Sequence, residues 1–244
     1  MYYKLLNNNK KYHFYDINDL NIEKSKIKSL NLCNSNLKLL PDLSEFINLE
    51  FLNIKYNNCI KLPSILNNIN LKEFNCEFCE LKELPDLSKC INLKKIHCYV
   101  NELTKITDLS KCINLQILNC FDNNLTELPN LSNCINLIDL DCYTNNLTEL
   151  PNLSNCINLI DLDCNNNNNL TELPDLTKCK KLKYYKKYNK LYELPNLSKC
   201  KKLKYYKKYN KYLYAKLNYL LNYKIKYYYL LPIITYYKSI YLNN

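Results

Sequence analysis

The sequence predicts a solenoid, a stack of short repeats that share one continuous core and carry a parallel β-sheet along one side. Three observations predict it: a 22-residue period, alternating apolar residues within each period, and a proline at a fixed place in most periods. The period is plain in the segment PNLSNCINLIDLDC, which occurs at 129–142 and again at 151–164. One such repeat cannot bury its apolar side alone, whereas stacked repeats bury it against each other.

Seven consecutive units follow one another in strict phase over residues 27–180. They begin at Ile27, Leu49, Leu71, Leu93, Leu115, Leu137 and Leu159. Their shared pattern, L-x-x-L-x-(C/L/I)-x-x-N-x-L-x-x-L-P-x-L-S-x-C-x-N, resembles the leucine-rich repeat, and its length lies within that family's range. The length resembles the short class typified by a nuclear protein-phosphatase regulator, and L-P-x-L resembles repeats of bacterial effectors. The resemblance implies an α/β-type leucine-rich repeat solenoid, a horseshoe with the parallel sheet on its concave face.

Physical arguments predict the conformation of each half of the unit. The stretch L-x-x-L-x-C alternates as a strand does, and strands from successive units stack about 4.8 Å apart. The proline starts the convex return, which is too short for a full helix, so we expect 3₁₀ turns or extended chain there. The resemblance implies that the ninth residue turns inward and bonds to the backbone of the neighbouring coil. That residue is Asn57, Asn101, Asn123, Asn145 or Asn167, with Ser35 and Cys79 as exceptions.

Most of the 14 cysteines occupy two places in the unit that should face the core. Free cysteine acts as a small buried hydrophobe, so core filling is the favoured reading. The alternative is a zinc site at Cys76 and Cys79 with His97 and Cys98, because C-x₂-C spacing suits zinc. The chain has no second C-x₂-C, and we therefore expect no metal and no cofactor.

Composition excludes several function classes. The chain has no Gly, so the phosphate-binding loops that depend on Gly are absent. Its start lacks a signal-peptide pattern, and its many cysteines read as reduced thiols, so we expect an intracellular, cytoplasmic protein that is not secreted. Nucleophilic catalysis by cysteine needs a nearby imidazole, but His97 should point outward and Cys98 inward. We therefore expect no enzymatic activity and no small-molecule substrate.

Charge divides the chain into segments. Residues 1–177 carry 16 Lys against 22 Asp and Glu, whereas residues 178–244 carry 18 Lys against one acid. We predict an N-terminal flank or cap at 1–26, the seven repeats at 27–180, two degenerate Lys- and Tyr-rich repeats at 181–211, and a non-repeat tail at 212–244. The basic segment 178–241 is open to three readings: nucleic-acid binding, anionic-membrane binding, or a degenerate array end, which we favour.

The concave face is the predicted partner-binding site, because leucine-rich repeat proteins usually bind partners there. Its outward side chains include an aromatic column, a group of aspartates and their neighbours: Lys95, His97, Tyr99, Ile117, Asn119, Phe121, Asp139, Asp141, Tyr143, Asp161 and Asp163. Exposed aromatics anchor protein partners, and the acidic end favours a basic partner segment. The aspartates could also serve acid–base chemistry or a metal, but an open face offers little desolvation.

The plain repeats and the composition also resemble the leucine-rich repeat proteins of amoeba-infecting giant DNA viruses. That resemblance implies a viral protein expressed inside a host cell, with a host protein as its partner. A substrate adaptor for ubiquitin ligation is a further reading, ranked lower because the flank before the repeats is short.

Overall fold

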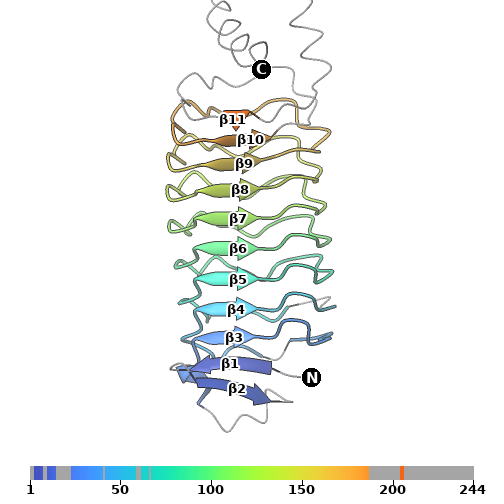
Figure 1. Ribbon diagram of the computed structural model, residues 1–244, viewed down its shortest axis with the longest axis vertical. Coiled ribbons are helices and arrows are strands. Elements are labelled where there is room, and N and C mark those ends of the chain that lie inside the picture. Colours follow the sequence, from blue (N-terminus) through green and yellow to red (C-terminus); the bar gives the residue numbers. More distant parts are fainter. Residues whose placement is uncertain are drawn as a thin grey trace, which may run out of the picture.

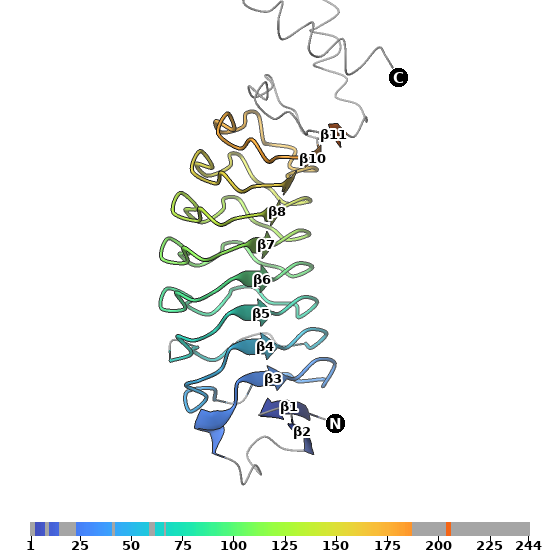
Figure 2. The same cartoon turned by 60° about the vertical axis from the view of Figure 1, so that its left-hand side comes forward.

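The computed structural model describes residues 3–7, 10–14, 23–40, 42–58, 62–65, 67–186 and 204–205. In these ranges the strands form one 11-stranded sheet in the order β11-β10-β9-β8-β7-β6-β5-β4-β3-β1-β2. The sheet runs along one side of a stack of coils, with the return segments on the other side (Figures 1 and 2). The predicted tail at 212–244, and with it most of the basic segment, lies outside the described residues.

The repeats supply the parallel part of the sheet. Each unit contributes three residues, and each residue lies opposite the one 22 positions further along the chain. The strands are β3 (Ser29–Asn31), β4 (Phe51–Asn53), β5 (Glu73–Asn75), β6 (Lys95–His97), β7 (Ile117–Asn119), β8 (Asp139–Asp141) and β9 (Asp161–Asp163). The predicted solenoid with a parallel sheet is thereby confirmed.

Both ends of the sheet continue beyond the regular repeats. At the N-terminal end, β1 (Tyr3–Asn7) and β2 (Lys10–Phe14) form an antiparallel hairpin, and β1 pairs antiparallel with β3. At the other end, β10 (Tyr184–Lys186) and β11 (Lys204–Tyr205) extend the parallel order. The two degenerate units start 21 residues apart in the sequence. In the sheet, however, Tyr184 pairs with Lys204, so the strand register is one residue shorter than this step.

The core is a set of parallel rows, one residue per coil, which we number by position from the first residue of each unit. Both cysteine positions are buried throughout the described repeats, and so are the leucine positions, except that Leu37, Leu40 and Leu173 are only partly buried against the core. All the described cysteines are free thiols, and every one except the half-buried Cys33 is buried. Burial raises the pKa of the Cys98 thiol to about 12, which keeps it neutral as a core residue must be.

The ninth position forms an asparagine ladder, made by Asn57, Asn101, Asn123, Asn145 and Asn167. In Asn123, Nδ2 donates to the carbonyls of Cys98 at 3.0 Å and Cys120 at 3.1 Å, and Oδ1 accepts the Leu103 amide at 3.0 Å. The bonds thus tie one coil to the preceding one as well as to its own strand. Where Cys79 replaces asparagine, its Sγ donates to the Ile54 carbonyl at 3.1 Å and keeps part of the ladder.

The return side is extended chain with tight turns, as predicted. In the unit that starts at Leu93, the Cys112 amide donates to the Leu109 carbonyl at 2.9 Å and the Leu115 amide to the Cys112 carbonyl at 3.0 Å. These three-residue steps are those of a 3₁₀ turn. The one helical segment of the described residues is the 3₁₀ turn η1 (Lys24–Lys26), just before the first unit.

A sharp backbone reversal follows each strand at position eight. Its φ is positive in Asn34, Tyr56, Phe78, Val100, Asp122, Thr144 and Asn166. This left-handed region favours glycine, which the chain lacks, and a non-glycine residue held there costs roughly 1–3 kcal/mol. The ladder bonds and the coil-to-coil packing must outweigh that cost in every coil.

Candidate partner-binding face

The outward face of the sheet consists of positions three, five and seven of each unit. In β6 the side chains of Lys95 and His97 lie half-buried on this face, while Ile96 and Cys98 are fully buried behind it. His97 and Cys98 therefore lie on opposite sides of the sheet, as the alternation predicts. Ile117 and Asn119 occupy the same face of β7 and are also half-buried.

An aromatic ladder runs across this face through five coils: Tyr56, Phe78, Tyr99, Phe121 and Tyr143. Ring centroids of Tyr99 and Phe121 lie 4.3 Å apart, and those of Phe121 and Tyr143 lie 4.9 Å apart, both pairs stacked. Phe78 meets Tyr99 edge-on at 5.8 Å and stacks on Tyr56 at 5.0 Å. Each contact adds attraction beyond the buried area, so the rings hold one another in place.

Sequence reasoning predicted three of these rings and missed Tyr56 and Phe78. Both are at position eight, outside the strand alternation, where the positive φ turns the ring toward the face. They are also the most exposed members of the ladder, at 47% and 41%. One feature of the sequence could have revealed them. Position seven, which carries an aromatic ring in the next three units, holds Lys55 or Glu77 here, and the ring follows at position eight.

Charges beside the N-terminal part of the ladder are paired across coils. Lys55 Nζ lies 3.1 Å from Glu77 Oε1 and 5.4 Å from the centroid of the Tyr56 ring. The Glu77 carboxylate, 5% exposed at its side chain, raises the pKa of Lys55 above its usual range through their hydrogen bond. Lys95 Nζ lies 3.4 Å from Glu73 Oε2. These pairs neutralise this end of the face.

The opposite end of the ladder adjoins two strands that each carry two aspartates. Asp139 lies opposite Asp161 in the sheet, and Asp141 lies opposite Asp163. Asp141 Oδ1 accepts the Tyr143 amide at 3.3 Å, and Asp163 Oδ1 accepts both the amide and the side-chain Nδ2 of Asn165. Asn31, Asn53 and Asn75 make the same backbone bond at the ends of their strands. The fifth position thus ends the strand as well as facing outward.

Asp163 departs from the predicted exposure, because it is only 7% exposed. Its bonds to Asn165 fold that side chain against the sheet, and Asn165 is buried as well. Of the four aspartates, Asp139, Asp141 and Asp161 therefore present the acidic surface beside Tyr143.

His97 lies between the paired lysines and the aromatic rings. Desolvation lowers its pKa from the usual 6.5, and the nearby carboxylates of Glu73 and Glu77 oppose that shift. The imidazole is therefore neutral at pH 7, a polar group on the face rather than a cation.

The cysteines proposed as a zinc site are part of the core. Cys76 and Cys98 are fully buried in the row behind the sheet, and Cys79 serves in the asparagine ladder. In the part of the chain that the structure describes, no group of three or more His, Cys, Asp or Glu side chains could hold a metal ion. No helix among those residues is long and apolar enough to cross a membrane.

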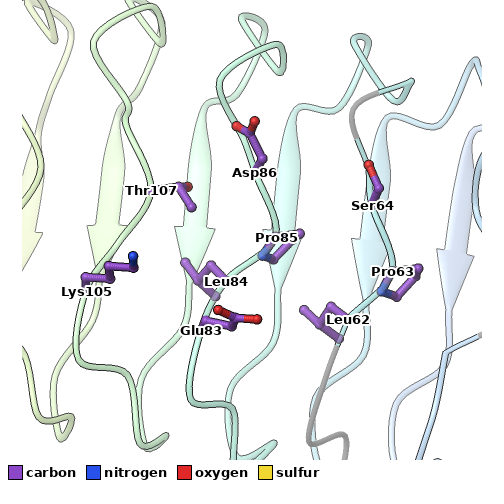
Figure 3. A pocket seen from close by; sticks show the side chains of 9 residues that line it. All are labelled: Leu62, Pro63, Ser64, Glu83, Leu84, Pro85, Asp86, Lys105 and Thr107. Atoms are coloured by element: carbon purple, nitrogen blue, oxygen red, sulfur yellow. The ribbon is translucent and has the colours of Figure 1, made fainter.

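A shallow pocket of about 360 Å³ lies on the return side, away from the aromatic ladder (Figure 3). It is formed where the Leu-Pro corners of neighbouring coils meet, and Thr107 replaces the proline of the next coil. The lining residues are Leu62, Pro63, Ser64, Glu83, Leu84, Pro85, Asp86, Lys105 and Thr107. With neither a nucleophile–base pair nor an aromatic ring among them, the pocket is a product of the repeat and not a second candidate site.

Comparison with solved structures shows that known proteins share this architecture. The chain is similar to YopM from Yersinia enterocolitica WA-314 (28% identity, TM-score 0.58), over 69% of this chain and 34% of that one. It is similar to YopM of Yersinia pestis, a leucine-rich effector protein (28% identity, TM-score 0.59), over 69% of this chain and 51% of that one. The aligned region thus spans between a third and about half of those two proteins.

A plant receptor shares the architecture too. The leucine-rich repeat ectodomain of the Arabidopsis thaliana receptor kinase GASSHO1/SCHENGEN3, solved in complex with CASPARIAN STRIP INTEGRITY FACTOR 2, is 25% identical with a TM-score of 0.59. The similarity covers 73% of this chain and 26% of that one. No protein-family model matches the chain, and no curated protein matches it. The in-register coils, the asparagine ladder and these similarities together identify the fold of this chain as the leucine-rich repeat solenoid.

Proposed function

We propose that the chain is a non-catalytic protein-interaction module that binds a partner protein on the outer face of its sheet. The observation that carries the proposal is the aromatic ladder, five rings from successive coils that remain partly exposed although they stack on one another. Tyr and Phe anchor protein interfaces because they bury a large area at a low cost in side-chain entropy. Rings that are already held in place reduce that cost further.

The charges beside the ladder favour one kind of partner. Asp139, Asp141 and Asp161 lie beside Tyr143 at one end of the ladder, whereas Lys55 and Lys95 are paired with glutamates toward the other end. A partner segment that lays an apolar stretch along the rings and a basic stretch over the aspartates matches this gradient. Lys95, His97, Ile117 and Asn119 complete the contact surface between the two ends.

Two further observations support the proposal. One similar structure is a receptor ectodomain in complex with CASPARIAN STRIP INTEGRITY FACTOR 2, and another is an effector protein. The described cysteines are all free thiols, which favours a reducing compartment, and we place the interaction inside the cell. A host protein as partner follows if the giant-virus resemblance holds.

The test compares partner recovery by the full chain and by a variant carrying Tyr99→Ala, Phe121→Ala and Tyr143→Ala. A matched control carries Leu39→Ala, Thr126→Ala and Thr148→Ala, three exposed residues that belong to neither this face nor the strand edge. Proteins recovered by the wild type and the control but lost by the ladder variant support the proposal. Equal recovery by all three chains, each shown to be folded by circular dichroism, would place the interaction elsewhere and refute it.

A second comparison tests the partner's charge. Asp139→Asn with Asp161→Asn should weaken the same interaction mainly at low salt, because screening removes the electrostatic contribution at high salt. A loss that is independent of salt contradicts the basic-partner assignment while leaving the aromatic contact intact.

A further inference from the structure

The turns that precede the strands lie at the strand-start edge of the stack (Figure 1). These turns carry a second apolar row. We call it the isoleucine ridge. It consists of one isoleucine from each of six consecutive coils, each 48–53% exposed: Ile47, Ile69, Ile91, Ile113, Ile135 and Ile157. The equivalent residues in the flanking coils, two before the next unit start, are Ser25 and Lys180. The ridge therefore has defined ends and a length of about 24 Å at the usual strand spacing.

The chemistry of the coil does not explain why this position stays isoleucine. The residue two places earlier, also on the turn, changes freely from Glu45 through Asn67 and Lys89 to Asn133. The asparagine that follows each isoleucine has a structural role, since Asn92 Nδ2 donates to the Ile69 carbonyl at 3.1 Å and Asn158 Nδ2 to the Ile135 carbonyl at 3.0 Å. The isoleucine side chains leave half their surface to solvent in all six coils, on turns that these bonds hold rigid.

The ridge lies in a basic strip of an otherwise acidic repeat region. Exposed lysines flank it at Lys89, Lys94, Lys111, Lys178 and Lys181, and Lys181 Nζ bonds to Asn158 Oδ1 beside the ridge. The carboxylates near the strip are offset by lysines. Glu45 pairs with Lys24, and Glu50 pairs with both Lys28 and Lys72. Bonds from serine lower the pKa of the Asp86 and Asp108 carboxyl groups, and the nearby Lys89 and Lys111 lower it further. Lys28, Glu50 and Lys72 line one shallow hollow together with Asn48, Asn70 and Asn92, which directly follow three isoleucines of the ridge. These charges therefore lie along the ridge.

We propose that the isoleucine ridge and its flanking lysines are a contact site for a membrane surface that contains anionic lipid. A row of exposed isoleucines on turns held by hydrogen bonds can lie against a membrane surface, where the flanking lysines reach the headgroups. A second copy of the chain fits less well: in a two-fold contact the central lysines Lys89, Lys94 and Lys111 face their own copies. The ridge is separate from the aromatic ladder, and the two surfaces are free to act together.

The chain contains no tryptophan, which makes one introduced indole a clean probe. The full chain with Ile113→Trp is mixed with vesicles of phosphatidylcholine, with or without phosphatidylserine, and its emission is recorded. The control is Thr126→Trp, an exposed position in the next unit, away from the ridge. A blue shift for Ile113→Trp with the anionic vesicles, and none for Thr126→Trp, is the expected result. No shift for Ile113→Trp overturns the proposal.

A second experiment separates the ridge from every other basic part of the chain. Vesicle sedimentation compares the wild type with Ile91→Thr, Ile113→Thr and Ile135→Thr combined, and with a control carrying Thr104→Ser, Thr126→Ser and Thr148→Ser, each in the unit that follows one of these isoleucines. The isoleucine variant should lose about tenfold or more in binding to anionic vesicles, and the control should match the wild type. Equal binding by all three, or a ridge variant that only converts a dimer to a monomer in sedimentation velocity, overturns the proposal.

Discussion

Asn123→Ala should cost about 3 kcal/mol of the free energy of unfolding. The Asn123 side chain, 8% exposed, makes three well-placed bonds, to the Cys98 and Cys120 carbonyls and from the Leu103 amide. Each is worth about 1 kcal/mol net, and leaving the buried Leu103 amide without an acceptor adds to the loss. Asn123→Cys should cost less, because a thiol at this position still donates to the backbone, as Cys79 does.

The assay is urea unfolding of both variants followed by circular dichroism, combined with hydrogen exchange at the Leu103 amide. Exchange of that amide should accelerate by about tenfold or more in Asn123→Ala, since its acceptor has been removed. The matched control is Asn124→Ala, an exposed neighbour on the same turn, which should stay within about 0.5 kcal/mol of the wild type. An Asn123→Ala chain that is as stable as this control, with Leu103 still protected, refutes the assignment of the ladder as the link between coils.

Three further predictions follow from backbone strain, the buried thiols and the half-buried imidazole of His97. Val100 has a φ of 52°, which is unfavourable for a β-branched residue. Val100→Asn, which copies Asn34 and Asn166 at the same position, should therefore raise the free energy of unfolding, measured with urea, by about 1 kcal/mol. Asp122→Asn, the control, should have almost no effect. Burial raises the pKa of the Cys90, Cys98 and Cys134 thiols to about 12, while the unfolded chain loses these protons near pH 9. Stability should therefore be full below about pH 9 and fall as the pH rises toward about 12, and a melting temperature that stays constant over this interval contradicts the burial of the thiols. Desolvation lowers the pKa of His97 below 6.5, so its stabilising contribution should be present above that pH and be lost as the pH falls, and an NMR titration midpoint at or above 6.5 is the contrary result.

The sequence predicts the features of this fold that recur with its period. The leucine and cysteine rows, the strand at L-x-x-L-x-C and the inward asparagine at position nine repeat every 22 residues, and each follows from alternation or from the family resemblance. The aromatic rings at Tyr99, Phe121 and Tyr143 could be placed outside the core for the same reason. Their positions on the face follow directly from strand geometry.

Features set by local dihedrals and by neighbouring coils could not be predicted in this way. Tyr56 and Phe78 join the aromatic ladder only because φ is positive at position eight, which alternation does not reveal. Asp163 is buried because Asn165, two residues later, bonds to it and covers it. The isoleucine ridge escaped prediction because its position lies on a turn, where neither strand alternation nor the repeat pattern shows which way a side chain faces.

The spacing of the cross-coil bonds has a consequence for how this chain changes length over evolutionary time. The asparagine bonds between coils join residues 20, 22 or 25 positions apart, and the same offsets recur from coil to coil. Excision or duplication of one 22-residue block by recombination, for which the identical segments at 129–142 and 151–164 are natural endpoints, regenerates every donor and acceptor at the junction. The length of the recognition surface can therefore change by whole coils, each adding about 4.8 Å, while the packing of the core stays the same.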